Sequence, residues 1–204
     1  MASDMAIDRA PTFKERVKQE RELEILQAAR DVFSDVGYDR ASIDDIAERV
    51  GIGKGTVYLH FANKEAILVA IMRHGVRGLV DRIHGQVVAR DSAQDKLRAV
   101  LEALVEHRYA NESLVRMVSS EIPHFLANKE RAEAIGELRE LIASLIRQGQ
   151  EQGELNAKPE AYFTALAMLS LVFACDKQGD PMPKQKLLES ANQLYFHGIS
   201  KEAS

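Results

Sequence analysis

The feature that most constrains the fold is a short amphipathic helix that a glycine closes. Four apolar residues recur at the spacing of one helix face, namely Ile43, Ile46, Ala47 and Val50. Ser42 suits the N-cap before them, and Asp45 three residues later forms a short-armed capping box. Gly51 then ends this helix after about two turns, and a second short helix is predicted to begin near Gly53. Two short helices joined by a glycine turn form a helix-turn-helix unit.

Helical patterns also occupy the rest of the chain. Residues 1–20 predict a flexible arm, and an apolar face from about Arg21 continues to Gly37, which suits a helix C-terminus. Further on, apolar residues at helical spacing predict helices at about 64–90, 92–109, 112–122, 129–152, 159–177 and 184–199. No stretch of useful length alternates in the manner of a β-strand. The predicted fold class is therefore all-α.

The composition limits the chemistry that the chain can perform. Cys175 is the single cysteine, and none of the six histidines has metal-ligand spacing. The longest apolar run, residues 161–175, is shorter than the roughly 20 residues of a membrane span, and no signal peptide is recognisable. No carboxylate pair or nucleophile–base pair stands out. We therefore expect a cytoplasmic protein that is not an enzyme and has no cofactor or metal.

The net charge gives no sign of a nucleic-acid partner. The whole chain carries a net charge of −4, and residues 1–65 contain 10 Lys and Arg against 13 Asp and Glu. Any affinity for DNA must therefore come from the local placement of charge and not from a basic domain.

The glycine-rich stretch GIGKGTVYLHF, residues 51–61, invites comparison with nucleotide-binding loops. A P-loop requires Ser or Thr after its Gly-Lys pair, whereas Gly55 follows Gly53-Lys54 here. In the dinucleotide-binding pattern, Thr56 stands where the third glycine belongs, and a helix precedes the stretch where a strand is needed. Both nucleotide interpretations therefore fail.

A helix-turn-helix accounts for more of these residues. Val57 and Phe61, four residues apart, face inward, and Gly53 is an acceptable N-cap. The side chains expected to point outward, toward a major groove, belong to Lys54, Gly55, Thr56, Tyr58 and His60. Lysine donates to guanine or phosphate, and threonine offers a hydroxyl and a methyl group.

At these positions the sequence resembles the TetR family of bacterial transcriptional regulators over roughly residues 21–68. The family pattern F-x-x-x-G-Y occurs at residues 33–38, followed by the capped helix with Ser42, Ile46 and Ala47. The run G-[IV]-x-x-x-x-[ILV]-Y-x-H-F-x-x-K-E-x-[IL] matches residues 51–67. The remaining two-thirds of the chain resembles the family in length and helix content alone.

The resemblance implies which residues bind DNA. In the family, residues matching Ser42, Tyr58 and Lys64 contact phosphates, and each has a physical reason to do so. Many members of the family also have a basic N-terminal arm. The candidates for it in this chain are Lys14, Arg16, Lys18 and Arg21. Gly53 replaces the usual Ser or Thr, and Gly55 leaves fewer side chains to contact bases. The sequence therefore leaves open how specificity is divided between direct readout of bases and DNA shape.

For the larger part, the resemblance implies a small-molecule pocket and a dimer. The candidate ligand-binding residues are His107, Tyr109, Met117, Phe125, Met168 and Phe173, although each of them also suits an ordinary core. The helix predicted at 159–177 is apolar on almost all sides, which indicates burial between two subunits together with the helix at 184–199. The predicted domains are the arm, residues 1–20; a DNA-binding domain, 21–66; and a ligand-binding and dimerisation domain, 67–204.

We therefore predict a homodimeric transcriptional regulator, more specifically a repressor that a small hydrophobic ligand releases from operator DNA. Two alternatives remain open at this point. One is a DNA-binding co-regulator with no small-molecule effector, and the other is a helical enzyme, which no catalytic pattern supports.

Overall fold

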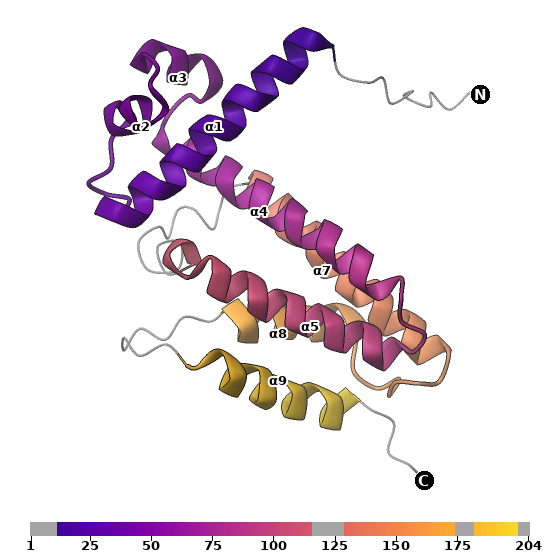
Figure 1. Cartoon of the computed structure of the whole chain (residues 1–204). Helices are drawn as coiled ribbons and strands as arrows, with labels where there is room; N and C mark the ends of the chain where they lie inside the picture. The colour runs from indigo at the N-terminus through magenta and orange to yellow at the C-terminus, as the bar shows by residue number, and fades with distance from the viewer. Residues whose placement is uncertain (1–11, 116–128, 174–181, 200–204) are drawn as a thin grey trace, which may run out of the picture. The chain divides into compact units, whose positions relative to one another are not determined.

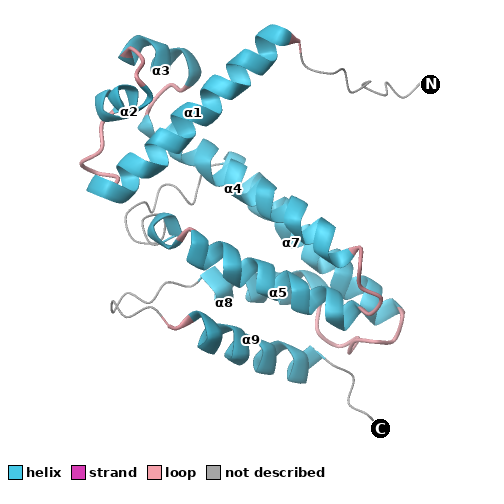
Figure 2. Cartoon of the chain, viewed as in Figure 1, coloured by secondary structure: helices cyan, strands magenta, loops and turns pink. Residues whose placement is uncertain are grey.

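The computed structural model describes residues 12–115, 129–173 and 182–199, and within these ranges it contains helices and no strand (Figure 2). The predicted all-α fold is confirmed. The chain divides into two compact units, Met1–Ala70 and Ile71–Ser204. The helices are α1 (Phe13–Val36), α2 (Ile43–Val50), α3 (Lys54–His60), α4 (Lys64–Val87), α5 (Ala93–Ala110), α7 (Lys129–Glu151), α8 (Ala161–Phe173) and α9 (Lys184–Ile199) (Figure 1).

Helix α1 begins at Phe13, well before the predicted start near Arg21. The cause is a capping box, in which the Thr12 hydroxyl accepts from the Glu15 amide at 3.3 Å and the Glu15 carboxylate accepts from the Thr12 amide at 2.6 Å. The predicted flexible arm is therefore wrong for residues 13–20, while residues 1–11 lie outside the described ranges. The cations at positions 14, 16, 18 and 21 belong to this helix and not to an extended arm.

The first unit packs α1 against α2, and α2 against α3. Gly37 ends α1 with a positive φ of 82°, as predicted, and its amide donates to the Phe33 carbonyl at 3.0 Å. The buried apolar side chains come from all of the unit's helices and include Ile25, Ala29, Val32, Phe33, Ile46, Val57, Ile67 and Leu68. This core fixes the orientation of α3, because Val57 anchors its inner face.

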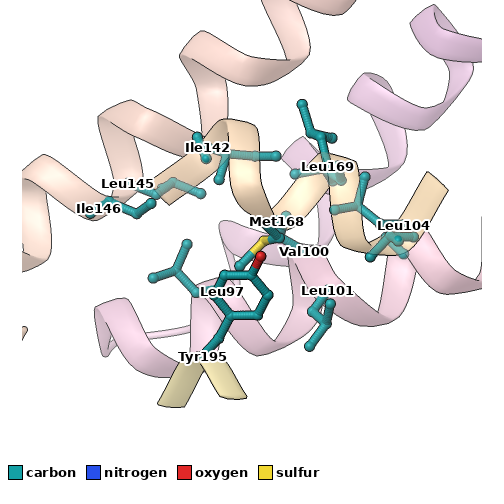
Figure 3. Close-up of a cluster of buried hydrophobic side chains, with 14 of the residues drawn as sticks. Leu97, Val100, Leu101, Leu104, Ile142, Leu145, Ile146, Met168, Leu169 and Tyr195 are labelled. Carbon is teal, nitrogen blue, oxygen red and sulfur yellow. The ribbon is translucent and has the colours of Figure 1, made fainter. Parts of the chain in front are cut away.

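The second unit is built around α5, which packs against α7, α8 and α9. Helix α8 in turn contacts both α7 and α9. Figure 3 shows part of the resulting core, with side chains from these four helices pointing toward one another: Leu97, Val100, Leu101, Leu104, Ile142, Leu145, Ile146, Met168, Leu169 and Tyr195. The core is apolar, and none of the buried residues that the structure describes is polar or charged.

The predicted helix positions in this unit agree with the structure to within a few residues. Ser92 caps α5, as its position before an apolar face predicts, and its hydroxyl accepts from the Asp95 amide at 3.0 Å. The predicted helix at 159–177 corresponds to α8, of which Phe173 is the last described residue. Of the predicted helix at 112–122, residues 112–115 are described and helical, and the rest lies outside the described ranges.

Candidate nucleic-acid interface

The turn between α2 and α3 depends on a left-handed glycine. Gly51 has φ 78° and ψ 33°, and its amide donates to the Ala47 and Glu48 carbonyls at 3.0 and 3.1 Å. The Ile52 amide also donates to the Ala47 carbonyl, at 3.0 Å. These bonds satisfy the last carbonyls of α2 and turn the chain directly into α3. The glycine turn predicted from the sequence is confirmed.

Helix α3 has one buried and one exposed face. Val57 is fully buried and Phe61, directly after the helix, is nearly so. The exposed residues include three that the sequence placed outward, Lys54, Gly55 and Tyr58, whereas Thr56 is half-buried. Gly53 caps the helix through its backbone alone, since its carbonyl accepts from the Thr56 amide at 2.8 Å. The exposed face of α3 therefore carries few side chains, and α3 stands at the position of a recognition helix.

Ser42 forms the predicted cap of α2. Its hydroxyl accepts from the Asp45 amide at 3.1 Å and donates to the Asp45 carboxylate at 2.7 Å. The Ser42 amide donates to the same carboxylate at 2.8 Å, and these hydrogen bonds lower the pKa of Asp45. Because the hydroxyl is already engaged, Ser42 positions the start of α2 rather than presenting an unoccupied donor.

Lys54 forms an ion pair across the helix-turn-helix. Its ammonium lies 2.6 Å from the Asp44 carboxylate, and both side chains are largely exposed. The hydrogen bond to Asp44 raises the pKa of Lys54, so the lysine stays charged well above neutral pH. A DNA phosphate or a guanine must therefore compete with Asp44 for this cation.

We predicted that the His60 side chain points outward, and the structure shows that it does not. Its side chain is only 11% exposed, and Nδ1 lies 3.3 Å from the Glu22 carboxylate of α1. Successive residues of an α-helix are separated by about 100°, so His60 projects only about 60° from the direction of buried Val57. This angle turns the imidazole toward α1 and makes it part of the packing between α1 and α3.

Lys64, for which the family resemblance implies a phosphate contact, is bonded within the first unit. The Nζ atom of this first residue of α4 donates to the carbonyls of Tyr38, Asp39 and Ala41 at 2.5, 3.3 and 3.0 Å. It also lies 4.3 Å from the centroid of the Tyr38 ring. An ammonium has three N–H donors, and here the three carbonyls satisfy all of them. These contacts hold the linker between α1 and α2.

One prominent residue of α3, Leu59, was not predicted from the sequence. Leu59 is strongly exposed, next to Tyr58 and on the side of the helix opposite Val57. The helical angle from Val57 is the signal in the sequence that identifies its position.

The structure describes four of the six candidate ligand residues. The His107 and Phe173 rings lie edge to face with centroids 6.4 Å apart, and the Tyr109 hydroxyl donates to the Met182 carbonyl. Met168 is fully buried between α5, α7 and α9 (Figure 3). The other two, Met117 and Phe125, lie outside the described residues.

His107 lies in a polar cluster at the C-terminal end of α5. Its Nδ1 lies 3.2 Å from the Arg82 guanidinium of α4 and 3.4 Å from the Asn111 amide. Since both neighbours donate, Nδ1 is the accepting nitrogen. The imidazole also lies close to Gly75 of α4, where an added Cβ would be in ordinary van der Waals contact with Cε1 of His107 at 3.5 Å.

The described ranges hold no group of three or more His, Cys, Asp or Glu side chains arranged to bind a metal ion. Within the same ranges, no helix is both long enough and apolar enough to cross a membrane.

The fold and this surface define a helix-turn-helix protein with a second, larger helical unit, and comparison with known proteins specifies its class. Residues 25–71 match the model of bacterial regulatory proteins of the tetR family, and residues 90–175 match that of the tetracyclin repressor-like C-terminal domain. The HTH-type transcriptional repressor KstR2 of Rhodococcus jostii (strain RHA1) is 31% identical over 147 residues, which cover 69% of this chain and 70% of that protein. The chain therefore belongs to the TetR family of bacterial transcriptional regulators.

Solved structures show the same fold. The fatty acid degradation regulator FadR from Bacillus halodurans has a TM-score of 0.74 and 20% identity, covering 91% of this chain and 96% of that chain. FadR from Bacillus subtilis, solved in complex with stearoyl-CoA, has a TM-score of 0.69 and 18% identity, covering 84% of this chain and 94% of that chain. These relatives are transcriptional regulators, and the prediction that this chain is not an enzyme is confirmed by its family.

Proposed function

We propose that this protein is a homodimeric transcriptional repressor of the cytoplasm that leaves its operator when a small hydrophobic ligand binds. The observation that carries the proposal is the exposed face of α3, which is held outward by buried Val57 and follows the turn at Gly51. A helix exposed in this way after a glycine turn is suited to enter a major groove.

The DNA contacts that we propose follow the geometry of α2 and α3. Lys54 and Tyr58 supply polar donors on the exposed face, Thr56 lies at its edge, and Gly53 and Gly55 allow close approach of the backbone. Ser42, His60 and Lys64 support this surface from behind through their internal hydrogen bonds. As a dimer, the protein binds a near-palindromic operator with half-site centres about 34–36 Å apart, or a multiple of that distance.

The proposed dimer interface uses α8 and α9. Phe163 of α8 is 66% exposed and Leu194 of α9 is 64% exposed, and Tyr162 and Leu166 add apolar surface on α8. The Tyr162 and Phe163 rings lie edge to face, 5.7 Å apart, so the surface is already ordered within one subunit. Large apolar side chains on two adjoining helices mark a surface for self-association. Phe163→Glu should therefore give a monomer by sedimentation with unchanged helix content.

The ligand proposal rests on two kinds of support. The structure brings His107 and Phe173 together at the end of the α5–α8 contact, and the FadR relative from Bacillus subtilis was solved with stearoyl-CoA. A ligand with a long apolar chain and a polar head is therefore the proposed class. Helix α4 contributes residues to both units, and we propose that it transmits the effect of the ligand to the DNA-binding unit.

The proposal is tested by measuring the affinity of the purified dimer for its own upstream DNA by fluorescence anisotropy. Long-chain acyl-CoA, free fatty acid and CoA alone are then added separately. We expect sequence-specific binding, and one apolar ligand should weaken it about 5- to 150-fold, the usual range of allosteric coupling. Specific binding that no compound alters would favour a co-regulator without an effector, and absence of specific binding would refute the proposal as a whole.

A further inference from the structure

Leu59 occupies the outermost position of α3. Its side chain is 80% exposed, although it is apolar and its neighbour Val57 is fully buried. At about 100° per residue, Leu59 projects about 200° from Val57. Gly55, four residues earlier, projects in nearly the same direction, so the two lie one above the other at the centre of the exposed face.

The bare surface at Gly55 gives Leu59 its prominence. A side chain on an α-helix leans toward the turn that precedes its own Cα, which directs the Leu59 isobutyl group toward the turn containing Gly55. A Cβ added at Gly55 would meet no atom within 4 Å, so no described side chain lies directly against that position. The outermost part of α3 therefore consists of one apolar side chain, beside a residue that has no side chain.

Three polar residues of α3 are less available than this leucine, whereas Tyr58 is 48% exposed. The Lys54 ammonium is bonded to Asp44 at 2.6 Å, the Thr56 side chain is half-buried, and His60 is turned toward Glu22. In the major groove of B-DNA, the apolar group that distinguishes one base is the C5-methyl of thymine. An exposed leucine at the tip of a recognition helix has the matching chemistry.

We propose that Leu59 is a specificity-determining residue that selects thymine by packing against its C5-methyl group. The inference rests on the proposed function, because α3 must enter the major groove for this contact to form. It explains how a helix with two glycines among its first residues obtains base selectivity: the contact is apolar and does not depend on hydrogen bonds.

The test removes the C5-methyl group from the thymine side of the contact and the isopropyl group from the leucine side. The operator is first obtained by selection from random DNA with the full-length protein. Each thymine is then replaced by deoxyuridine in both half-sites, and the affinities of the wild type and of Leu59→Ala are measured for every substituted operator. Leu59→Met, which keeps an apolar side chain of similar length, serves as the matched control. Since Leu59 is outside the core, neither variant should lose helix content.

We expect one or two thymine positions at which deoxyuridine weakens wild-type binding about fourfold per half-site, the effect of leaving one methyl-sized group in water. Leu59→Ala should lose this sensitivity at those positions alone, and Leu59→Met should keep it. If every deoxyuridine substitution has equal effects on the wild type and Leu59→Ala, the proposal is overturned, and Leu59 then serves another contact such as a protein partner. Failure of the wild type to select any sequence would overturn the DNA-binding function itself, which is a separate outcome.

Discussion

Replacing Lys64 by methionine separates two roles that the same residue can have. Methionine keeps an unbranched side chain of similar length and good helix propensity, but it removes the ammonium group. If Lys64 holds the linker between α1 and α2, the variant should be less stable before any DNA is added. If Lys64 contacts phosphate, the variant should be as stable as the wild type and bind DNA with a weaker salt dependence.

The size of the stability loss follows from the three carbonyls. Those of Tyr38 and Ala41 are bonded at 2.5 and 3.0 Å in part-buried positions, whereas that of Asp39 is exposed and bonded at 3.3 Å. A hydrogen bond to a charged group contributes about 1.5–3 kcal/mol, and water replaces the exposed one at little cost. Since the two remaining sites are only partly buried, we expect Lys64→Met to lower the free energy of unfolding by about 3 kcal/mol in total.

The assay pairs urea unfolding, followed by circular dichroism, with the salt dependence of DNA binding. For B-DNA, log K changes with log salt by about −0.9 per phosphate contact, so two lysines in a dimer account for about 1.8 of the slope. Lys64→Met should lower the urea midpoint and leave this slope unchanged. Lys54→Met is the matched control, because Lys54 bonds to Asp44 on an exposed surface. It should leave the midpoint unchanged and reduce the slope.

One result would refute this reasoning about Lys64. If Lys64→Met unfolds at the wild-type urea concentration and its salt slope is smaller by about 1.8, the ammonium contacts phosphate and the carbonyl contacts carry no stability. The Lys54→Met data then show whether the slope measurement itself responds to the loss of a cation.

Two further predictions concern the second unit. Gly149→Ala should destabilise the protein by about 1–2 kcal/mol, because the new Cβ would lie 2.5 Å from Cβ of Ala93 and 2.6 Å from Cδ1 of Leu155. Gly136→Ala in the same helix is the control, since its Cβ meets only a guanidinium at 3.6 Å, and it should be neutral or stabilising. Urea unfolding measures both effects. Burial raises the pKa of Tyr195, which is 6% exposed, to about 12. The unfolded chain therefore ionises from about pH 10 while the folded chain stays protonated. Stability should fall between pH 10 and 12 by about 2 kcal/mol more in the wild type than in Tyr195→Phe, and equal losses would contradict the assignment.

Local signals in the sequence predict much of the first unit. Ser42, Gly37 and Gly51 have the predicted cap and turn roles because caps and left-handed glycines depend on residues within one turn of the helix. The early start of α1 was missed although Thr12 and Glu15 form a recognisable capping box. Apolar periodicity does not detect this start, because the first turns have no core face: Phe13 and Val17 are exposed.

The roles of Lys64 and His60 depend on contacts distant in the chain. Lys64 bonds to residues 38–41, and His60 lies against Glu22, which is contributed by α1. A family motif preserves the residue type at such positions, but it does not state whether the donor faces DNA or the protein's own backbone. The resemblance therefore placed these two residues in the helix-turn-helix, whereas the direction of their side chains required the packed structure.

The charge pattern of the first unit follows from the same packing. Within the described part of this unit, several cations lie within 4 Å of a carboxylate: Lys18, Arg21, Arg49 and Lys54. The excess of acidic residues is thus used partly for ion pairs that hold neighbouring helices and turns, such as Arg49 of α2 with Asp35 of α1 at 2.9 Å. Exposed pairs of this kind contribute little stability, but they reduce the attraction of the surface for phosphate. Binding that is weakly steered by charge must obtain its specificity at short range, which is the property that an exposed leucine on a glycine-rich helix supplies.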